Sequence, residues 1–375
     1  MKRIIKKSPI FLIFCLLIII LFPLKINAEY SPEKQMNEGS KHSILFPKVS
    51  NAKVIHEIIE IDVVPYFNDP KDYFVNYNIT YHIESDHEQI LPLIFIASNF
   101  KNSPINILIN GKEVNTNSIL DNQNLIFSIF PYIKSDGNEN VCIIDTKNNV
   151  NLFNIKELVY FNSLLKKGKN EIHLNYKGNL ESNNYGFLKN YNLDYYLFPY
   201  KFWNSFGPIF VKLNTPPNYK IKQSSIGNPS QKLSKNLYFW RLNKINKKEF
   251  KISLSPKIST LSYFLLLLKP VGITLTFGLL ISLIHIYFIK KFRKKDNHSI
   301  NYYLILGNII NPPLFYLTYC LSFKLIEWSL GSIALKNYEY IISPILYLPL
   351  IYVLYDYTMW FLDISLKNNT SLKNT

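Results

Sequence analysis

The sequence predicts a mainly β protein with membrane helices: an extracytoplasmic antiparallel β-sandwich followed by three C-terminal transmembrane helices. Three observations support this fold class. Side chains alternate between apolar and polar from Tyr73 to Ile83, as they do in a half-buried strand. A mostly apolar run from Pro270 to Ile289 is long enough to cross a bilayer as one helix. Hydrophobic residues make up 48% of the chain and charged residues only 18%, so part of it must lie in lipid.

The first 28 residues have the three parts of a secretory signal peptide. Basic residues precede an apolar core from Pro9 to Leu24, and Ile26-Asn27-Ala28 is a suitable cleavage site. An uncleaved membrane anchor is the alternative, and either segment would export the residues that follow it. Residues 29–50 are polar and have no periodicity, so we expect a linker there.

Residues 51–257 carry the alternating pattern of the sandwich. Apolar residues from Ile59 to Val63 alternate with acidic ones, and Asn110-Gly111 is a hairpin signal, because that turn needs positive φ at both central residues. Many short strands at regular spacing favour an antiparallel sandwich. Residues 154–165 fit either a short helix or an irregular crossover. Further strands are expected at Ile172–Tyr176, Ile209–Leu213, Tyr219–Lys222, Leu237–Leu242 and Phe250–Leu254.

Three segments of this region resemble the N-terminal β-domain of gluzincin aminopeptidases and related bacterial envelope β-sandwich proteins. They are the strand pair from Glu57 to Glu84, the hairpin Ile109-Asn110-Gly111-Lys112-Glu113-Val114, and Leu165-Lys166-Lys167-Gly168-Lys169-Asn170-Glu171-Ile172 followed by Tyr176-Lys177-Gly178. The resemblance covers residues 53–257. It implies a fold and no activity, because the catalytic domain of those enzymes is missing.

The membrane part begins after residue 257. Residues 258–269 are apolar, but joining them to the next apolar run would give a helix of about 48 Å, too long for one untilted span. We therefore expect an interfacial segment at 258–269 and a transmembrane helix at 270–289 that starts with Pro270. Basic residues from Lys290 to Lys295 place the following loop in the cytoplasm. The remaining predicted segments are that basic loop at 290–301, transmembrane helices at 302–323 and 340–362, an outer loop at 324–339 and a cytoplasmic tail at 363–375.

This orientation indicates a multi-pass protein of the bacterial cytoplasmic membrane, with an extracytoplasmic N-terminal domain and a cytoplasmic C-terminus. Residues 166–257 carry 17 basic and 4 acidic side chains, a net charge of +13. This charge either faces anionic lipid headgroups or an acidic envelope polymer, or it is a solvated surface. Nucleic acid is excluded as a partner, because the charged domain lies outside the cytoplasm.

The sequence has no convincing catalytic motif. His56-Glu57-Ile58-Ile59-Glu60 begins like the zinc motif HExxH, but it ends in Glu and lies in a strand pattern, where residues four apart do not converge. The 7 histidines show no ligand spacing, and the common nucleophile, phosphate-loop and dinucleotide motifs are absent. We expect no catalytic residue, no cofactor and no metal.

Polar residues inside the predicted spans are the first candidate site. Asn308 and Asn311 lie one turn apart before Pro312-Pro313, which we expect to kink or break the second span. Asp356 lies in the third span, where an ionisable group is costly and often functional. These three side chains either meet inside a small bundle or partner subunit, or serve only as helix contacts and a solvated interfacial carboxylate.

Aromatic residues between Tyr191 and Trp203 are the second candidate site. They could stack on sugars or line a groove for a partner, or they could fill the core of the sandwich. The candidates for binding are Tyr195, Tyr196, Tyr200 and Trp203.

These observations favour a non-enzymatic envelope protein whose ectodomain binds another envelope protein, a glycan or a second copy of itself. One alternative is a subunit of a membrane transport or signalling complex, in which the broken second span and Asp356 carry the function. A membrane-bound hydrolase with a scattered site is the other alternative.

Overall fold

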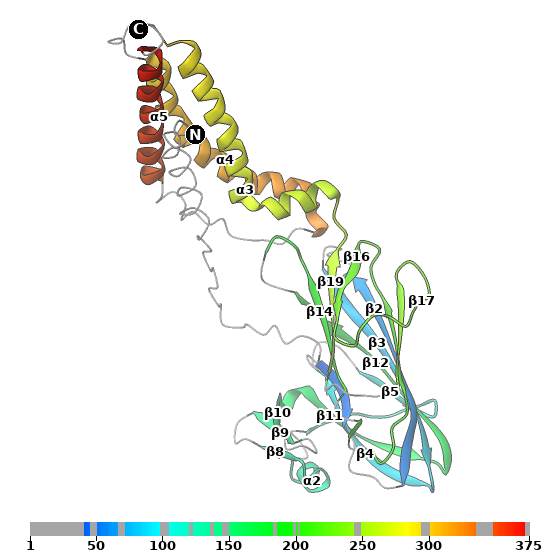
Figure 1. Ribbon diagram of the computed structural model, residues 1–375. Helices are drawn as coiled ribbons and strands as arrows, with labels where there is room; N and C mark the ends of the chain where they lie inside the picture. Colours follow the sequence, from blue (N-terminus) through cyan, green and yellow to red (C-terminus); the bar gives the residue numbers. More distant parts are fainter. Residues whose placement is uncertain are drawn as a thin grey trace, which may run out of the picture. The chain divides into compact units, whose positions relative to one another are not determined.

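The computed structural model divides the chain into two compact units, Met36–Lys257 and the combination of Met1–Gln35 with Ile258–Thr375 (Figure 1). We call them the β unit and the helical unit. The signal peptide predicted at residues 1–28 lies outside the described residues. The structure describes residues 41–45, 51–66, 72–97, 105–119, 123–135, 139–144, 150–182, 186–197, 200–201, 203–243, 249–293, 301–334 and 348–371.

The first sheet of the β unit has eight strands in the order β17-β18-β15-β2-β3-β12-β5-β6. Burial alternates along all of β3, because successive side chains point to opposite faces of the sheet. The turn between β5 and β6 has φ of 50° at Asn110 and 78° at Gly111, which confirms the predicted hairpin. The strands are β2 (Ala52–Pro65), β3 (Tyr73–Ser85), β5 (Asn106–Ile109), β6 (Lys112–Glu113), β12 (Gly168–Asn179), β15 (Ile209–Asn214), β17 (Gln231–Lys232) and β18 (Leu237–Leu242).

The second sheet also has eight strands, in the order β16-β19-β14-β1-β4-β11-β7, with β13 paired to β14. Strand β1 falls within residues 29–50, where a linker was expected. It is too short to show periodicity, and it forms because β4 and β14 offer backbone partners on both sides. The strands are β1 (Lys41–Leu45), β4 (Gln89–Ala97), β7 (Asn117–Ser118), β11 (Leu158–Leu165), β13 (Glu181–Ser182), β14 (Tyr191–Tyr196), β16 (Tyr219–Ser224) and β19 (Glu249–Pro256).

One hydrophobic core is shared by the two sheets. It contains the inward row of β3, including Tyr77 and Ile79, together with Leu93 and Phe95 of β4 and Ile252 of β19. Figure 1 shows the strands of both sheets running alongside each other. The apolar rows that the sequence predicts are thus the inner faces of the β unit.

Neither sheet is purely antiparallel, which corrects the prediction. Strand β1 pairs with β14 in parallel, and β15 pairs with β2 in parallel. Hydrophobic alternation cannot distinguish the two arrangements, because it fixes only which face of a strand is buried.

A smaller layer covers part of the second sheet. A three-stranded sheet in the order β10-β9-β8 and helix α2 pack on Ile94 and Ile96 of β4, while Phe95 faces the main core. Of residues 154–165, left open between helix and crossover, Asn154 ends β10 and the others form a short 3-10 helix and then β11. The elements of this layer are α2 (Gln123–Ile129), β8 (Ile133–Ser135), β9 (Asn140–Ile144), β10 (Val150–Asn154) and η4 (Ile155–Glu157).

The helical unit contains α3 (Thr260–Lys291), α4 (Tyr302–Ala334) and α5 (Leu348–Ser371). Thr260–Lys291 and Tyr302–Gly331 are long and apolar enough to cross a membrane, and little of either is buried within the structure. Large side chains such as Leu267, Phe277 and Leu283 are exposed along α3. Such continuous apolar surface is typical of helices in contact with lipid.

The break within α3 lies at the predicted start of the first span, whereas α5 differs from the predicted third span. Helix α3 includes residues 260–268 and breaks at Lys269, directly before Pro270, where the first span is predicted to start. Helix α5 is not among the described helices that meet the length and apolarity of a span, and it continues past the predicted end at Leu362. Residues 340–347 of the predicted third span lie outside the described residues.

Candidate functional site

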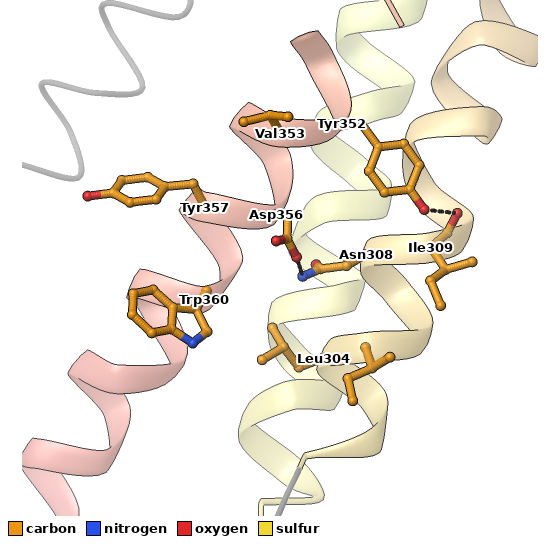
Figure 2. Close-up of a pocket in the computed structure, with 9 residues that line it drawn as sticks. Leu304, Asn308, Ile309, Tyr352, Val353, Asp356, Tyr357 and Trp360 are labelled. Carbon is orange, nitrogen blue, oxygen red and sulfur yellow. Dashed lines mark hydrogen bonds between the residues drawn. The ribbon is translucent and has the colours of Figure 1, made fainter. Parts of the chain in front are cut away.

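The three polar residues predicted in the spans are brought to the contact between α4 and α5. The Asn308 side-chain amide donates a hydrogen bond to the Asp356 carboxylate, and the two side chains point towards each other in Figure 2. Asn311, one turn further along α4, donates to the Tyr355 hydroxyl at 2.6 Å. Asn308 and Asn311 are each 6% exposed, whereas Asp356 is exposed at the surface of α5.

His285 and Tyr355 also belong to this polar cluster, and the sequence did not single them out. The imidazole Nε2 of His285 on α3 lies 3.0 Å from the Tyr303 carbonyl oxygen, and its Nδ1 lies 2.8 Å from the Tyr355 hydroxyl. A carbonyl oxygen can only accept, so Nε2 carries a hydrogen and neutral Nδ1 accepts from Tyr355. Hydrogen bonds therefore run from Asn311 through Tyr355 to His285, across all three helices.

A glycine makes room for His285. A Cβ atom at Gly307 would lie 2.1 Å from His285 Nε2. The imidazole thus rests directly on the backbone of α4, where small residues allow close approach. The signal that could have found His285 is the combination of an ionisable residue inside an apolar run with a glycine in the next helix.

The double proline does not break α4, so the break, one of the two expected outcomes, is wrong. Backbone dihedrals stay helical at Pro312 and Pro313, and the internal break of this helix is at Gly331 instead. Pro313 has no N–H for the carbonyl of Ile309, but the Tyr352 hydroxyl on α5 donates to that oxygen at 3.1 Å (Figure 2). A side chain from the neighbouring helix thus replaces one missing backbone bond, as occurs in membrane helices.

An open pocket of about 520 Å³ lies beside the Asn308–Asp356 pair. Its walls are mostly apolar and aromatic, and the polar groups in it are few. Figure 2 shows Val353, Tyr357 and Trp360 along α5, whereas Tyr352 reaches from α5 across to α4. The lining residues are Leu304, Ile305, Asn308, Ile309, Tyr352, Val353, Asp356, Tyr357 and Trp360.

An ion pair marks the end of the bundle near the basic loop. Arg293, which follows α3, donates to the carboxylate of Asp363 on α5, and both side chains are largely buried. Asp363 is seven residues after Asp356, so the two carboxylates are separated by about 10 Å along the helix axis. Asp356 therefore lies about two helical turns further into the bundle than the ion pair.

The aromatic candidates between Tyr191 and Trp203 are largely core residues. Tyr195 is 1% and Trp203 is 6% exposed, and both belong to the shared core of the β unit. Tyr196 packs edge-on against Phe153, and Tyr200 packs against Phe206. These contacts support the structural alternative for this segment rather than an open sugar-binding surface.

A buried carboxylate in the β unit was also missed. Glu57 is 2% exposed, and it accepts a hydrogen bond from the Tyr195 hydroxyl at 2.7 Å. A β-bulge at Ile55 sets the phase of β2 so that Glu57 points inward with Ile59. Burial raises the pKa of Glu57 to about 7, against the opposing effect of hydrogen bonds from Tyr81 and Tyr195.

The bulge is held by a close backbone approach. Gly207 donates its N–H to the Val54 carbonyl at 2.9 Å, and a Cβ atom at Gly207 would lie 1.7 Å from the Ile55 carbonyl oxygen. Only glycine fits there without a backbone shift. Among the described residues, no group of three or more His, Cys, Asp or Glu side chains is placed to hold a metal.

Comparisons with known proteins give structural similarity only. No protein-family model matches the chain, and no curated protein matches it in sequence. The chain is similar to the crystal structure of a proposed nutrient binding protein from Legionella pneumophila, with 12% identity, a TM-score of 0.41, and coverage of 88% of this chain and 98% of that one. It is also similar to an M1 zinc metallopeptidase from Deinococcus radiodurans, with 8% identity, a TM-score of 0.26 and 56% of this chain covered. The match spans 46% of that metallopeptidase, and similarity of this degree carries no information about activity.

Proposed function

We propose that this protein is a non-enzymatic subunit of a membrane complex in a bacterial envelope, and that its helices carry the function. In this proposal the β unit is an extracytoplasmic β-sandwich, α3, α4 and α5 cross the cytoplasmic membrane, and the C-terminus is cytoplasmic. The proposal is supported by the exposed apolar surfaces of α3 and α4 and by the basic residues that follow α3. The core shared by the two large sheets supports the sandwich.

The observation that carries the proposal is the position of Asp356. Its carboxylate is exposed on α5, about two turns from the Arg293–Asp363 pair, which belongs at the cytoplasmic boundary in this orientation. An ionisable group at that depth costs roughly 2.5–3.5 kcal/mol or more when it faces lipid, so such groups face a partner or a polar cavity. Asn308 supplies one hydrogen bond, and a partner subunit would supply the remaining contacts.

The experiment is purification from native membranes in mild detergent, followed by measurement of the mass of the intact assembly. We expect an assembly larger than one 44.0 kDa chain, in a fixed stoichiometry. The double change Asn311→Leu and Asp356→Leu is expected to release the partner. Thr276→Leu, which replaces an exposed hydroxyl on α3, is the matched control and should leave the assembly intact. A single chain in the wild-type preparation, or an assembly that the double variant retains, would overturn the proposal.

A second candidate function is the binding of another envelope protein by the β unit. It is favoured by exposed apolar side chains on strands: Ile90 and Leu164 are direct cross-strand neighbours, and Val150 and Leu152 lie on β10. Exposed apolar side chains mark contacts with other proteins when they gather into a contiguous patch, and these pairs are the places where such a patch could form. Loss of a cross-linked partner after Ile90→Lys with Leu164→Lys, but not after the same change at Val150 and Leu152, would assign the contact to the first pair. Retention of the partner by both variants would exclude both surfaces.

A further inference from the structure

We infer that the pocket between α4 and α5 binds a transmembrane helix of a partner protein through a lysine or arginine side chain. The inference rests on the proposed function and names the chemistry of the partner. Its occupant is identified by three properties of the pocket: its shape, its charge and an unsatisfied hydrogen-bond acceptor.

The pocket has the shape of a groove along the helices. Its α5 side is formed by Val353, Asp356, Tyr357 and Trp360, which follow the spacing of three and four residues that places side chains on one helix face. This row extends over about 10 Å, or two helical turns. An apolar groove of this form, bounded by two helices, fits the side chains of a third helix better than a compact polar ligand.

The charge of the groove calls for a cation. Asp356 is exposed in the groove, where its carboxylate accepts the hydrogen bond from Asn308. Figure 2 shows the remaining carboxylate oxygen beside that bond. The described residues that line the pocket include no lysine, arginine or histidine, so a basic side chain of a partner helix would supply the opposite charge. Charged residues in membrane segments pair with one another in this way.

The unsatisfied acceptor is on Asn308. Its side-chain oxygen is buried and has no hydrogen-bond donor among the described residues, although its nitrogen donates to Asp356. A lysine ammonium has three donors and an arginine guanidinium five, so one basic side chain beside Asp356 has donors left for this oxygen once the Asn308 amide turns towards the groove. A thiol, a hydroxyl or an apolar side chain would leave the carboxylate without an opposite charge.

The test uses a synthetic transmembrane peptide of about 20 leucines and alanines as the probe. One peptide carries a single lysine seven residues from its cytoplasmic end, to match the depth of Asp356, and the control peptide carries leucine there. Full-length protein is reconstituted into phosphatidylcholine vesicles, and binding is measured as energy transfer from tryptophan to a dansyl group on the peptide. The protein variants are Asp356→Asn, which keeps the shape, and Asp356→Glu, which keeps the charge.

We expect the lysine peptide to bind wild type and Asp356→Glu at least about tenfold more tightly than Asp356→Asn, and the leucine peptide to show no such difference. Equal binding of the lysine peptide to wild type and Asp356→Asn would overturn the inference. The inference would also be overturned if the lysine peptide no longer bound wild type in vesicles that contain phosphatidylethanolamine, because the pocket would then bind a lipid ammonium group. If the assembly depends on Asp356 but binding of the lysine peptide does not, the proposed function stands and only this inference is overturned.

Discussion

Replacing Glu57 with glutamine should remove a pH dependence of the stability of the β unit. Glu57 is surrounded by core side chains, and among the described residues its hydrogen bonds come from the uncharged hydroxyls of Tyr81 and Tyr195. Its pKa of about 7 in the folded protein lies above the usual value of 4.5 for glutamate. Folding therefore favours the protonated carboxyl, and the β unit loses stability as the pH rises from 4.5 through 7.

The size of this loss follows from the change in pKa. A rise from 4.5 to about 7 corresponds to roughly 3 kcal/mol between the two ends of that range, at about 1.4 kcal/mol per pKa unit. Glutamine keeps the side-chain length and an oxygen that accepts from Tyr195, but it does not titrate. The free energy of unfolding of Glu57→Gln should therefore gain about 3 kcal/mol relative to wild type between pH 4.5 and pH 8.

The assay is urea unfolding of the full-length protein in detergent at several pH values. The chain has 4 tryptophans, and changing Trp328 and Trp360 to phenylalanine leaves Trp203 and Trp240 as reporters within the β unit. Glu60→Gln is the control, because Glu60 lies on the outer face of the same strand, 2.7 Å from Lys212 Nζ. If the difference in free energy of unfolding between Glu57→Gln and wild type stays constant from pH 4.5 to pH 8, the assignment of Glu57 as a protonated core residue is refuted.

Three further predictions concern close contacts. Gly207→Ala should lower the free energy of unfolding of the β unit by about 2 kcal/mol or more in the same urea assay, because its Cβ would collide with the bulge backbone; an unchanged midpoint would contradict this. Gly307→Ala should displace His285 and lower the free energy of unfolding of the helices by about 2 kcal/mol, measured by titration with sodium dodecyl sulfate. Gly278→Ala is the control and should have little effect, because its Cβ would meet only the edge of the Phe315 ring at 3.4 Å. Equal free energies of unfolding for those two variants would argue against the contact between His285 and the backbone of α4 at Gly307. Tyr352→Phe should cost about 1 kcal/mol in that detergent titration, since the proline-freed carbonyl loses its donor, and no loss would mean that another group satisfies it.

Local pattern in the sequence determined the main elements of both units. The alternation from Tyr73 to Ile83 identifies β3 because period two fixes which side chains face inward, and this holds regardless of the partner strands. The long apolar runs likewise correspond to α3 and α4. Asn308, Asn311 and Asp356 stood out because polar groups are rare and costly in such runs.

The tertiary structure alone decided which of these polar groups contact one another. It also decided that Glu57 points into the core and that the double proline stays helical. Tyr355 joins Asn311, 44 residues away, to His285, 70 residues away, and no local period encodes contacts at such separations. The inward direction of Glu57 depends on a bulge held by the backbone at Gly207, about 150 residues later in the chain. The double proline stays helical, and a hydroxyl from another helix supplies a donor for one of the two carbonyls that the prolines leave without an N–H, a contact that the local sequence does not encode.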